Sequence, residues 1–173
     1  MSSSYTISLS GLKEGHHTID FEIDKEFFEQ FEESEVKEGS LIANIEMDKR
    51  SSHLDMIIRV SGSLRLSCDR CLEMFSQPVS SENRLLVKFG KSIEDLDPDI
   101  LLLPADEYEL DLQQQIYEFI ILALPIKRVH PADKNGKSAC DPFMLKKLEE
   151  LLIEEEKEND PRWDELKKLM NDN

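Results

Sequence analysis

Residues 54–71 read LDMIIRVSGSLRLSCDRC, a strand-like run that ends in a pair of cysteines. Apolar and polar side chains alternate along much of this run, and a period of two predicts a β-strand. The segment from Phe75 to Phe89 alternates again, so we expect a strand that runs back along the first. Cys68 and Cys71 would then lie in the turn of a long hairpin. The core positions expected in the first strand are Ile57, Ile58, Val60, Leu64 and Leu66.

The N-terminal segment also has the pattern of half-buried strands. Alternation over residues 5–23 predicts a hairpin. Asp24 then precedes three phenylalanines at helical spacing, Phe27, Phe28 and Phe31, so a short helix capped by Asp24 should follow. Strand character resumes over residues 41–47, and Lys49-Arg-Ser-Ser52 is the expected turn into the next strand.

The second half of the chain carries a loop and several helical segments. Glycine, prolines and carboxylates over residues 90–106 predict a loop with one apolar insertion, Ile100–Leu103. A helix should open at Asp111 and stop at Pro125. Asp141-Pro142 and Asp160-Pro161 each supply an N-cap followed by a proline, which predicts two short terminal helices. The apolar face of the central helix, expected to lie on the sheet, comprises Ile116, Phe119, Ile120 and Ala123.

Together these elements predict an α+β fold. The expected architecture is a curved, partly barrel-like antiparallel β-sheet with packed helices and a C-terminal helical tail. Residues 1–140 are assigned to a single α+β domain and residues 141–173 to the tail. A length of 173 residues suits one domain with a core of its own.

All three cysteines and one of the four histidines fall in two short stretches. Cys68 and Cys71 have the Cys-x2-Cys spacing by which a tight turn aims two thiolates at one zinc ion. His130 and Cys140 are the economical donors to complete a tetrahedron, since one flanks a proline-bearing turn and the other precedes a helix cap. The pattern indicates a structural zinc site of three thiolates and one imidazole.

Other interpretations of these thiols stay open. Free cysteine is among the most buried residue types, so spacing alone leaves incidental buried thiols as an equal alternative to zinc. Leu72 stands where many zinc turns place glycine, and nine residues separate His130 from Cys140, a longer interval than usual. Cys68 and Cys71 could instead be a redox pair, although such pairs typically sit at a helix N-terminus and this one follows a strand.

Basic residues gather around the predicted metal ligands in an otherwise acidic chain. If the two halves of the chain meet at a metal, these charges converge and could contact phosphates or a protein partner. A salt-bridged or solvated surface is an equally good interpretation. The candidate partner-binding or RNA-binding residues are Arg65, Arg70, Lys127, Arg128, Lys134 and Lys137, with Lys88 and Lys91 also expected near the hairpin.

Net charge, cysteine content and the lack of catalytic motifs argue against several classes of function. The formal net charge of −16 means that the surface as a whole repels phosphate backbones and anionic lipids. The first residues lack the features of a secretory signal, and three cysteines cannot all pair within one chain, which favours a cytoplasmic protein. The longest apolar stretch is far too short to cross a bilayer. No phosphate-binding loop or hydrolase signature is present, so we expect no enzyme, no small-molecule substrate and no membrane association.

The residues around the cysteine pair resemble the hallmark of the YceD family. That stretch reads Leu66-Ser-Cys68-Asp-Arg-Cys71-Leu-Glu-Met-Phe75, and Asp111–Pro125, ending Leu122-Ala-Leu124-Pro125, is similar to the family's second hallmark, a helix that ends in Leu-Pro. Many members carry cysteine where this chain has His130 and further cysteines beyond Cys140. Histidine also binds zinc, so the departure keeps a four-donor site plausible and leaves a single site to propose.

The resemblance implies a role in the accumulation of large-subunit ribosomal RNA, with no established enzymatic activity. The function it implies is a non-enzymatic ribosome-biogenesis factor with a structural zinc site, acting on precursor large-subunit RNA or through a ribosomal protein. Ribosomal proteins are typically basic, so the acidic chain suits a protein partner better than bare RNA. The alternative function is a redox- or metal-responsive regulatory protein that uses Cys68 and Cys71.

Overall fold

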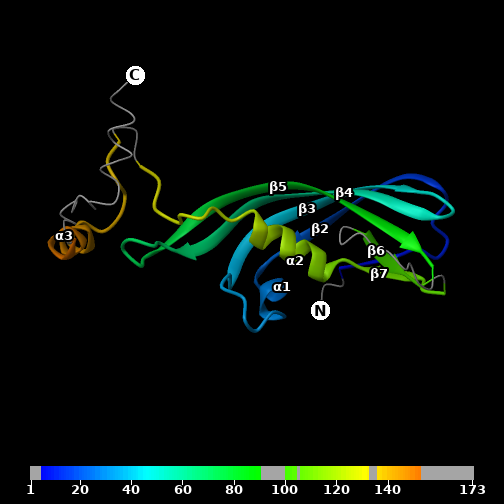
Figure 1. Cartoon of the computed structure of the whole chain (residues 1–173), viewed down its shortest axis with the longest axis horizontal. Coiled ribbons are helices and arrows are strands. Elements are labelled where there is room, and N and C mark those ends of the chain that lie inside the picture. Colours follow the sequence, from blue (N-terminus) through cyan, green and yellow to red (C-terminus); the bar gives the residue numbers. More distant parts are fainter. Residues whose placement is uncertain (1–4, 91–99, 105, 133–135, 153–173) are drawn as a thin grey trace, which may run out of the picture.

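The computed structural model describes residues 5–90, 100–104, 106–132 and 136–152 of the chain. Strands and helices both occur there, so the predicted α+β class is confirmed. Five strands build the main sheet in the order β2-β3-β4-β5-β6, and β1 and β7 form a separate two-stranded ribbon (Figure 1). The strands are β1 Thr6–Ser8, β2 Gly15–Ile23, β3 Glu38–Lys49, β4 His53–Ser67, β5 Met74–Phe89, β6 Ile100–Leu103 and β7 Glu109–Asp111.

The main sheet is antiparallel from β2 to β5 and adds one parallel strand at its edge. β4 and β5 stay paired from His53 and Lys88 to Ser67 and Met74, which confirms the predicted long hairpin. β6 runs parallel to the end of β5. The edge strands β2 and β6 do not pair with each other, so the part of the sheet that the structure describes is not closed, and the partly barrel-like shape stays a prediction.

Two predicted elements differ from the structure. Residues 5–23 do not form a hairpin, because β1 pairs with β7 and β2 pairs with β3. Alternation reports which side chains face inward and leaves the identity of the partner strand open. Ile100–Leu103, expected as an apolar insertion within a loop, is strand β6, which extends the sheet beside β5.

Two helices, α1 (Lys25–Glu29) and α2 (Gln113–Leu122), cover the inner face of the sheet. The predicted cap of α1 is confirmed, since the Asp24 carboxylate accepts a hydrogen bond from the Glu26 backbone N–H at 2.9 Å. α2 begins two residues after Asp111, whose carboxylate accepts from the Gln113 N–H at 2.9 Å. Both helices thus start where a carboxylate satisfies a free backbone donor.

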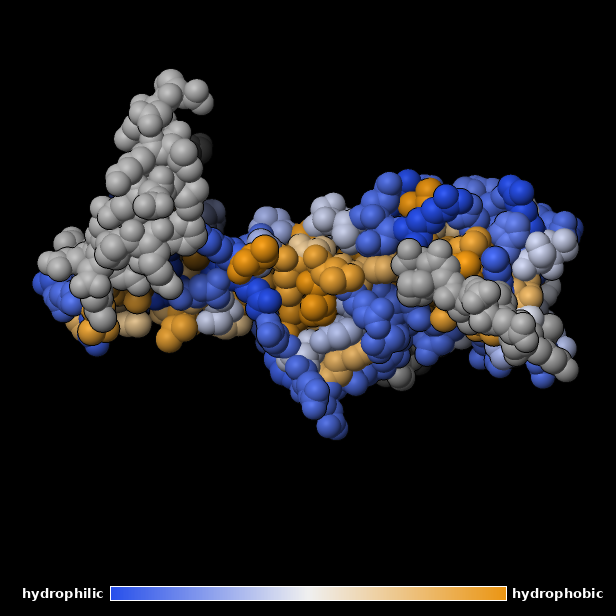
Figure 2. All heavy atoms as spheres, in the orientation of Figure 1, coloured by the Kyte–Doolittle hydropathy of each residue, from blue (hydrophilic) through white to orange (hydrophobic). Residues whose placement is uncertain are grey.

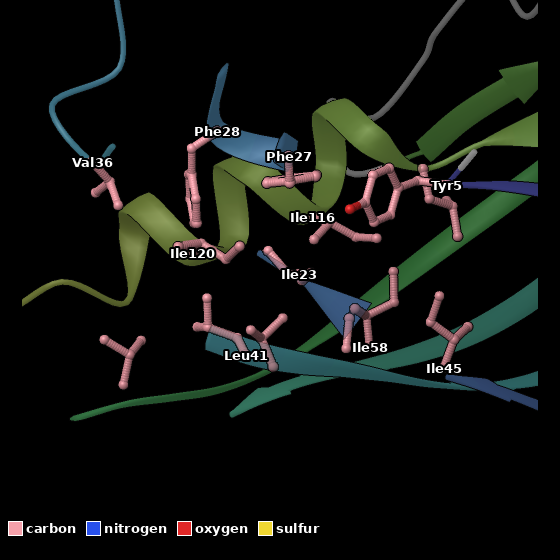
Figure 3. Close-up of a cluster of buried hydrophobic side chains, with 14 of the residues drawn as sticks. Tyr5, Ile23, Phe27, Phe28, Val36, Leu41, Ile45, Ile58, Ile116 and Ile120 are labelled. Carbon is pink, nitrogen blue, oxygen red and sulfur yellow. The ribbon is translucent and has the colours of Figure 1, made fainter. Parts of the chain in front are cut away.

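The core lies between these helices and the sheet. Figure 3 shows Ile116 and Ile120 of α2 and Phe27 and Phe28 of α1 above Ile58 of the sheet, and all five side chains are fully buried. Of the core positions predicted in β4, Ile57 is wrong: it is half-buried on the opposite face. Neighbouring residues of a strand point to opposite faces, so Ile57 and Ile58 cannot share one core. The other predicted positions, Ile58, Val60, Leu64 and Leu66, are buried.

The described chain ends in helix α3, Pro142–Leu151. Asp141 caps it as predicted, accepting from the Phe143 backbone N–H at 3.1 Å. No α3 residue is fully buried. The helix predicted after Asp160-Pro161 lies outside the described residues, and the division at residue 140 stays a prediction. None of the described helices has the length and apolar content needed to cross a membrane.

Candidate metal centre

The β4–β5 hairpin ends in a loop, residues 68–73, that carries the cysteine pair. The loop closes through two backbone hydrogen bonds, from the Cys68 N–H to the Glu73 carbonyl at 2.9 Å and from the Leu72 N–H to the Cys68 carbonyl at 2.9 Å. Leu72 has a φ of 63°. This left-handed conformation is the one that glycine adopts most readily, so Leu72 fills the expected glycine position at a conformational cost of roughly 1–2 kcal/mol.

Hydrogen bonds between Asp69 and Arg128 join the cysteine loop to the segment that carries His130. The Asp69 backbone N–H donates to the Arg128 carbonyl at 2.7 Å, and the Arg128 backbone N–H donates to the Asp69 carboxylate at 2.7 Å. The Arg128 side chain in turn forms a 2.5 Å ion pair with Glu35. These bonds fix the backbone two residues before His130, and therefore place the imidazole beside the thiols.

Cys140 arrives from the connector that precedes α3. An isolated β-bridge joins Ala132 to Ser138, and the Ser138 hydroxyl accepts a hydrogen bond from the Cys140 N–H at 3.2 Å. Asp141, the next residue, is the N-cap of α3. The start of the last described helix is therefore anchored directly behind the fourth donor.

The four predicted ligands meet in one cluster, with all ligand atoms within 4.8 Å of one another. The Sγ atoms of Cys68 and Cys140 are 3.6 Å apart. The Nδ1 atom of His130 lies 3.4 Å from the Cys71 sulfur and 3.7 Å from the Cys140 sulfur. Two sulfur ligands of a tetrahedral zinc ion lie about 3.8 Å apart, given Zn–S bonds of about 2.3 Å. The spacing therefore fits four donors around one ion.

The surroundings of the cluster favour metal ligation. The three cysteines are free thiols and buried, while His130 is half-buried. The His130 ring packs against Phe75, with ring centroids 4.9 Å apart. Since Nδ1 faces the sulfurs, Nε2 is the nitrogen left for a second contact. Packing against Phe75 limits rotation of the imidazole, and a preoriented ligand loses less entropy on binding.

The thiols differ in acidity. Burial raises the pKa of Cys68, but hydrogen bonds from the backbone N–H groups of Cys71, Arg70 and His130 and from the His130 ring lower it to about 6. Burial raises the pKa of Cys71, and the neighbouring thiols of Cys68 and Cys140 add to that rise. One thiolate is therefore stabilised in the cluster, whereas burial and repulsion by the neighbouring thiolate disfavour a second. A cation would remove that repulsion.

The predicted basic residues differ in whether they already form an ion pair with a carboxylate. Arg65 forms an ion pair with Glu38 at 4.0 Å, and Arg128 is paired with Glu35. Arg70 and Lys127 are exposed and form no ion pair with the residues that the structure describes, and Lys137 is also exposed. Lys134 and Lys91 lie outside the described residues.

One expectation about these charges is wrong. Lys88 was expected to cluster with Arg65 and Arg70, but it pairs with His53 at the far end of the β4–β5 hairpin, away from the cysteine loop. Two residues that matter at the site, Glu35 and Phe75, were not predicted as members. Glu35 is 93 residues from Arg128 in the chain, and no sequence spacing links such distant partners. Phe75 belongs to the YceD-like stretch Leu66–Phe75, but the sequence indicated no role for its side chain.

The fold and the cluster define the class of protein. It is an α+β protein with an open sheet, in which the loop of the longest hairpin meets the segment after α2 and brings three thiols and one imidazole together. A family model described as "Large ribosomal RNA subunit accumulation protein YceD" matches residues 56–170, more than half of the chain. The chain belongs to the YceD family. No curated protein and no solved structure matches it.

Proposed function

We propose that this protein is a cytoplasmic ribosome-biogenesis factor that supports the accumulation or processing of large-subunit ribosomal RNA and catalyses no reaction itself. The observation that carries the proposal is the family match, which covers most of β4, all of β5, α2 and α3, and all four residues of the Cys/His cluster. The family's description names large-subunit RNA accumulation. It names no particular RNA or protein partner, so the partner class is argued from the charged surface of the chain.

We further propose that Cys68, Cys71, His130 and Cys140 bind one zinc ion with a structural role. Four buried or half-buried donors of the type that zinc prefers, at tetrahedral spacing, support this assignment. Helix α3 has no buried residue. A metal bond between the hairpin loop and Cys140 would therefore attach α3 to the sheet where apolar packing is weak.

The proposed contact with a partner uses the cationic edge, defined as Arg65, Arg70, Lys127, Arg128, Lys134 and Lys137. Arg70 and Lys127 are its best contact residues, because both are exposed and form no ion pair within the described chain. Arg65 and Arg128 are already paired with glutamates, which lowers the gain from a new anionic partner. Precursor RNA or a ribosomal protein could meet this edge.

The test is genetic and biochemical. In cells deleted for the gene, the ratio of large-subunit to small-subunit ribosomal RNA should fall, and the wild-type chain should restore it. Arg70→Glu with Lys127→Glu should restore it poorly, whereas Lys13→Glu with Arg50→Glu, an equal change of charge at exposed sites near the opposite end of the sheet, should restore it fully. An unchanged ratio after deletion would contradict the proposed role.

The alternative, a redox- or metal-responsive regulator, draws support from the low pKa of Cys68, about 6, since a thiolate is the reactive form. Thiol titration separates the two functions. Structural zinc is favoured if the thiols react with the titrant only after a chelator has removed the metal. A disulfide that forms and breaks reversibly in the metal-free protein, at the reduction potential of the cytosol, would favour the regulatory function.

A further inference from the structure

The C-terminal end of α2 and the four residues that follow it carry apolar side chains that the fold leaves uncovered. Leu122 is 78% exposed and Ile126 is 100% exposed, while Ile121 and Leu124 beside them are half-buried. Figure 2 shows the resulting hydrophobic surface as orange spheres over α2, with hydrophilic blue surface around it. These four residues are named the α2 patch. Exposed apolar clusters of this kind typically mark binding sites.

The α2 patch rests on a preformed support. Tyr117, one helical turn before Ile121, is stacked on Phe31 with ring centroids 3.9 Å apart and an interplanar angle of 12°. This contact joins α2 to the segment that follows α1. On the other side, the Arg128–Glu35 ion pair joins the chain after Ile126 to the same segment. The patch is therefore held between two contacts and needs little rearrangement to bind a partner.

Three exposed carboxylates lie on the segments that carry or support the patch. Glu32 and Glu33 follow Phe31 and are exposed, and Glu118 lies one helical turn before Leu122. Within the described chain none of the three forms an ion pair, although Glu118 accepts a hydrogen bond from Gln114 at 2.8 Å. Lys127 is the exposed cation beside Ile126, since the charge of Arg128 is balanced by Glu35. Lys37, whose Nζ donates to the Glu32 carbonyl at 3.0 Å, is a second exposed lysine, while Arg84, which lines a cavity with Glu118 and Leu122, is balanced by Asp55. Three carboxylates therefore face two lysines, and the rim has a net negative charge.

We propose that the α2 patch docks a basic, amphipathic helical segment of a protein partner. The apolar face of that segment would cover Leu122 and Ile126, and its lysines or arginines would meet Glu32, Glu33 and Glu118. RNA fits this surface less well, because its phosphates would face the carboxylates and because the rings of Phe31 and Tyr117 are already stacked on each other. The proposal does not depend on the metal centre, and Arg128 of the cationic edge enters it only as a support for the patch through its ion pair with Glu35.

The test measures binding of the full-length protein to a fluorescein-labelled peptide of leucine and lysine, spaced to form an amphipathic helix. A second peptide has the same composition in an order that gives no apolar face. A labelled single-stranded RNA is the third probe. The amphipathic peptide should bind more tightly than the scrambled peptide, and Leu122→Ser with Ile126→Ser should weaken its binding by about tenfold or more.

Matched variants separate docking from general attraction to an acidic protein. Ile42→Ser removes a side chain that is 52% exposed on β3 and should change the affinity by less than about twofold. Glu32→Lys with Glu33→Lys should weaken peptide binding more than Glu14→Lys with Glu107→Lys. The second pair makes the same change in net charge at exposed positions, with Glu14 beside the end of β2 that lies away from residues 30–37.

Four results would overturn the proposal. The wild-type protein could fail to bind the amphipathic peptide, or it could bind both peptides equally. The two charge variants could weaken binding equally, which would reduce the effect to net charge. Finally, the RNA could bind and lose its affinity in the Leu122→Ser, Ile126→Ser variant, which would assign the patch to nucleic acid. Circular dichroism should show native folding of each variant, because the substituted side chains are exposed.

Discussion

Asp69 and Arg128, 59 residues apart in the chain, exchange two hydrogen bonds of 2.7 Å. Asp69 lies between the two cysteines of the hairpin loop, and Arg128 lies two residues before His130. This reciprocal contact aligns the halves of the Cys/His cluster through the protein chain alone. The cluster geometry therefore does not depend entirely on a metal ion.

Asp69→Ala should weaken both the fold and the metal site. The substitution removes the carboxylate that accepts the Arg128 N–H, so the free energy of unfolding should fall by about 1 kcal/mol. Affinity for zinc should fall by about tenfold, because outer contacts orient the ligands. Urea unfolding and competition with a chromophoric chelator measure the two effects. Arg70→Ala is the matched control in the same loop, and an equal loss in both variants would show that the Asp69 contact is unimportant.

His130→Ala should abolish stoichiometric zinc binding or reduce it severely. The imidazole supplies the donor that faces both the Cys71 and Cys140 sulfurs. Elemental analysis should find one zinc ion per wild-type chain and less than half of that in the variant. His16→Ala, which changes an exposed histidine on β2, should keep the wild-type content.

Chelation of wild-type protein should expose the α3 region to protease before the sheet unfolds, because α3 has no buried residue of its own. Limited proteolysis followed by mass spectrometry locates the first cleavage. Cleavage that begins in β4 or β5 would count against a structural role of zinc at the α3 junction, as would the absence of metal from freshly purified protein.

Asp55 should contribute to acid sensitivity. The hydrogen bond from Arg84 lowers the pKa of Asp55 below its ordinary value of 3.8, although burial opposes the shift. A carboxyl group with a lowered pKa adds stability that is fully present well above pH 3.8 and is lost as the pH falls through the folded-state pKa. Because Arg84 is largely exposed and Asp55 is partly exposed, the effect should be no more than about 1 kcal/mol. Urea unfolding between neutral and acid pH should show a smaller loss for Asp55→Asn than for wild type, whereas Glu14→Gln should behave as wild type.

Gly62→Ala should destabilise the β3–β4 pairing. Gly62 has a φ of 152°, and an added Cβ would lie 2.3 Å from the Ser40 carbonyl oxygen and 2.6 Å from the Leu41 Cα. The clash and the backbone strain should together cost about 3 kcal/mol or more. Gly15→Ala isolates the strain, since Gly15 has a φ of 122° with no atom within 4 Å of an added Cβ. Calorimetry should therefore give a clearly lower Tm for Gly62→Ala than for Gly15→Ala.

The local elements were predictable because their signals are local. Alternation marked β4 and β5, and Asp24 and Asp141 marked the starts of two helices through caps that act over two residues. Strand partners were less predictable. Tyr5–Ile23 has the alternation of a hairpin, yet Ile7 pairs with Leu110, because alternation specifies a buried face and carries no information about which distant strand shares it.

The sequence by itself determined the four candidate ligands, Cys68, Cys71, His130 and Cys140, since thiol and imidazole donors are few in this chain. It also determined the acidic character and the resemblance to YceD proteins. Only the tertiary structure decided that these donors meet, that Glu35 neutralises Arg128, and that Leu122 and Ile126 stay exposed. The reason is physical. The chemistry of each side chain can be identified from its own position in the sequence, whereas its burial and its partners depend on side chains that packing brings together over long separations in the chain.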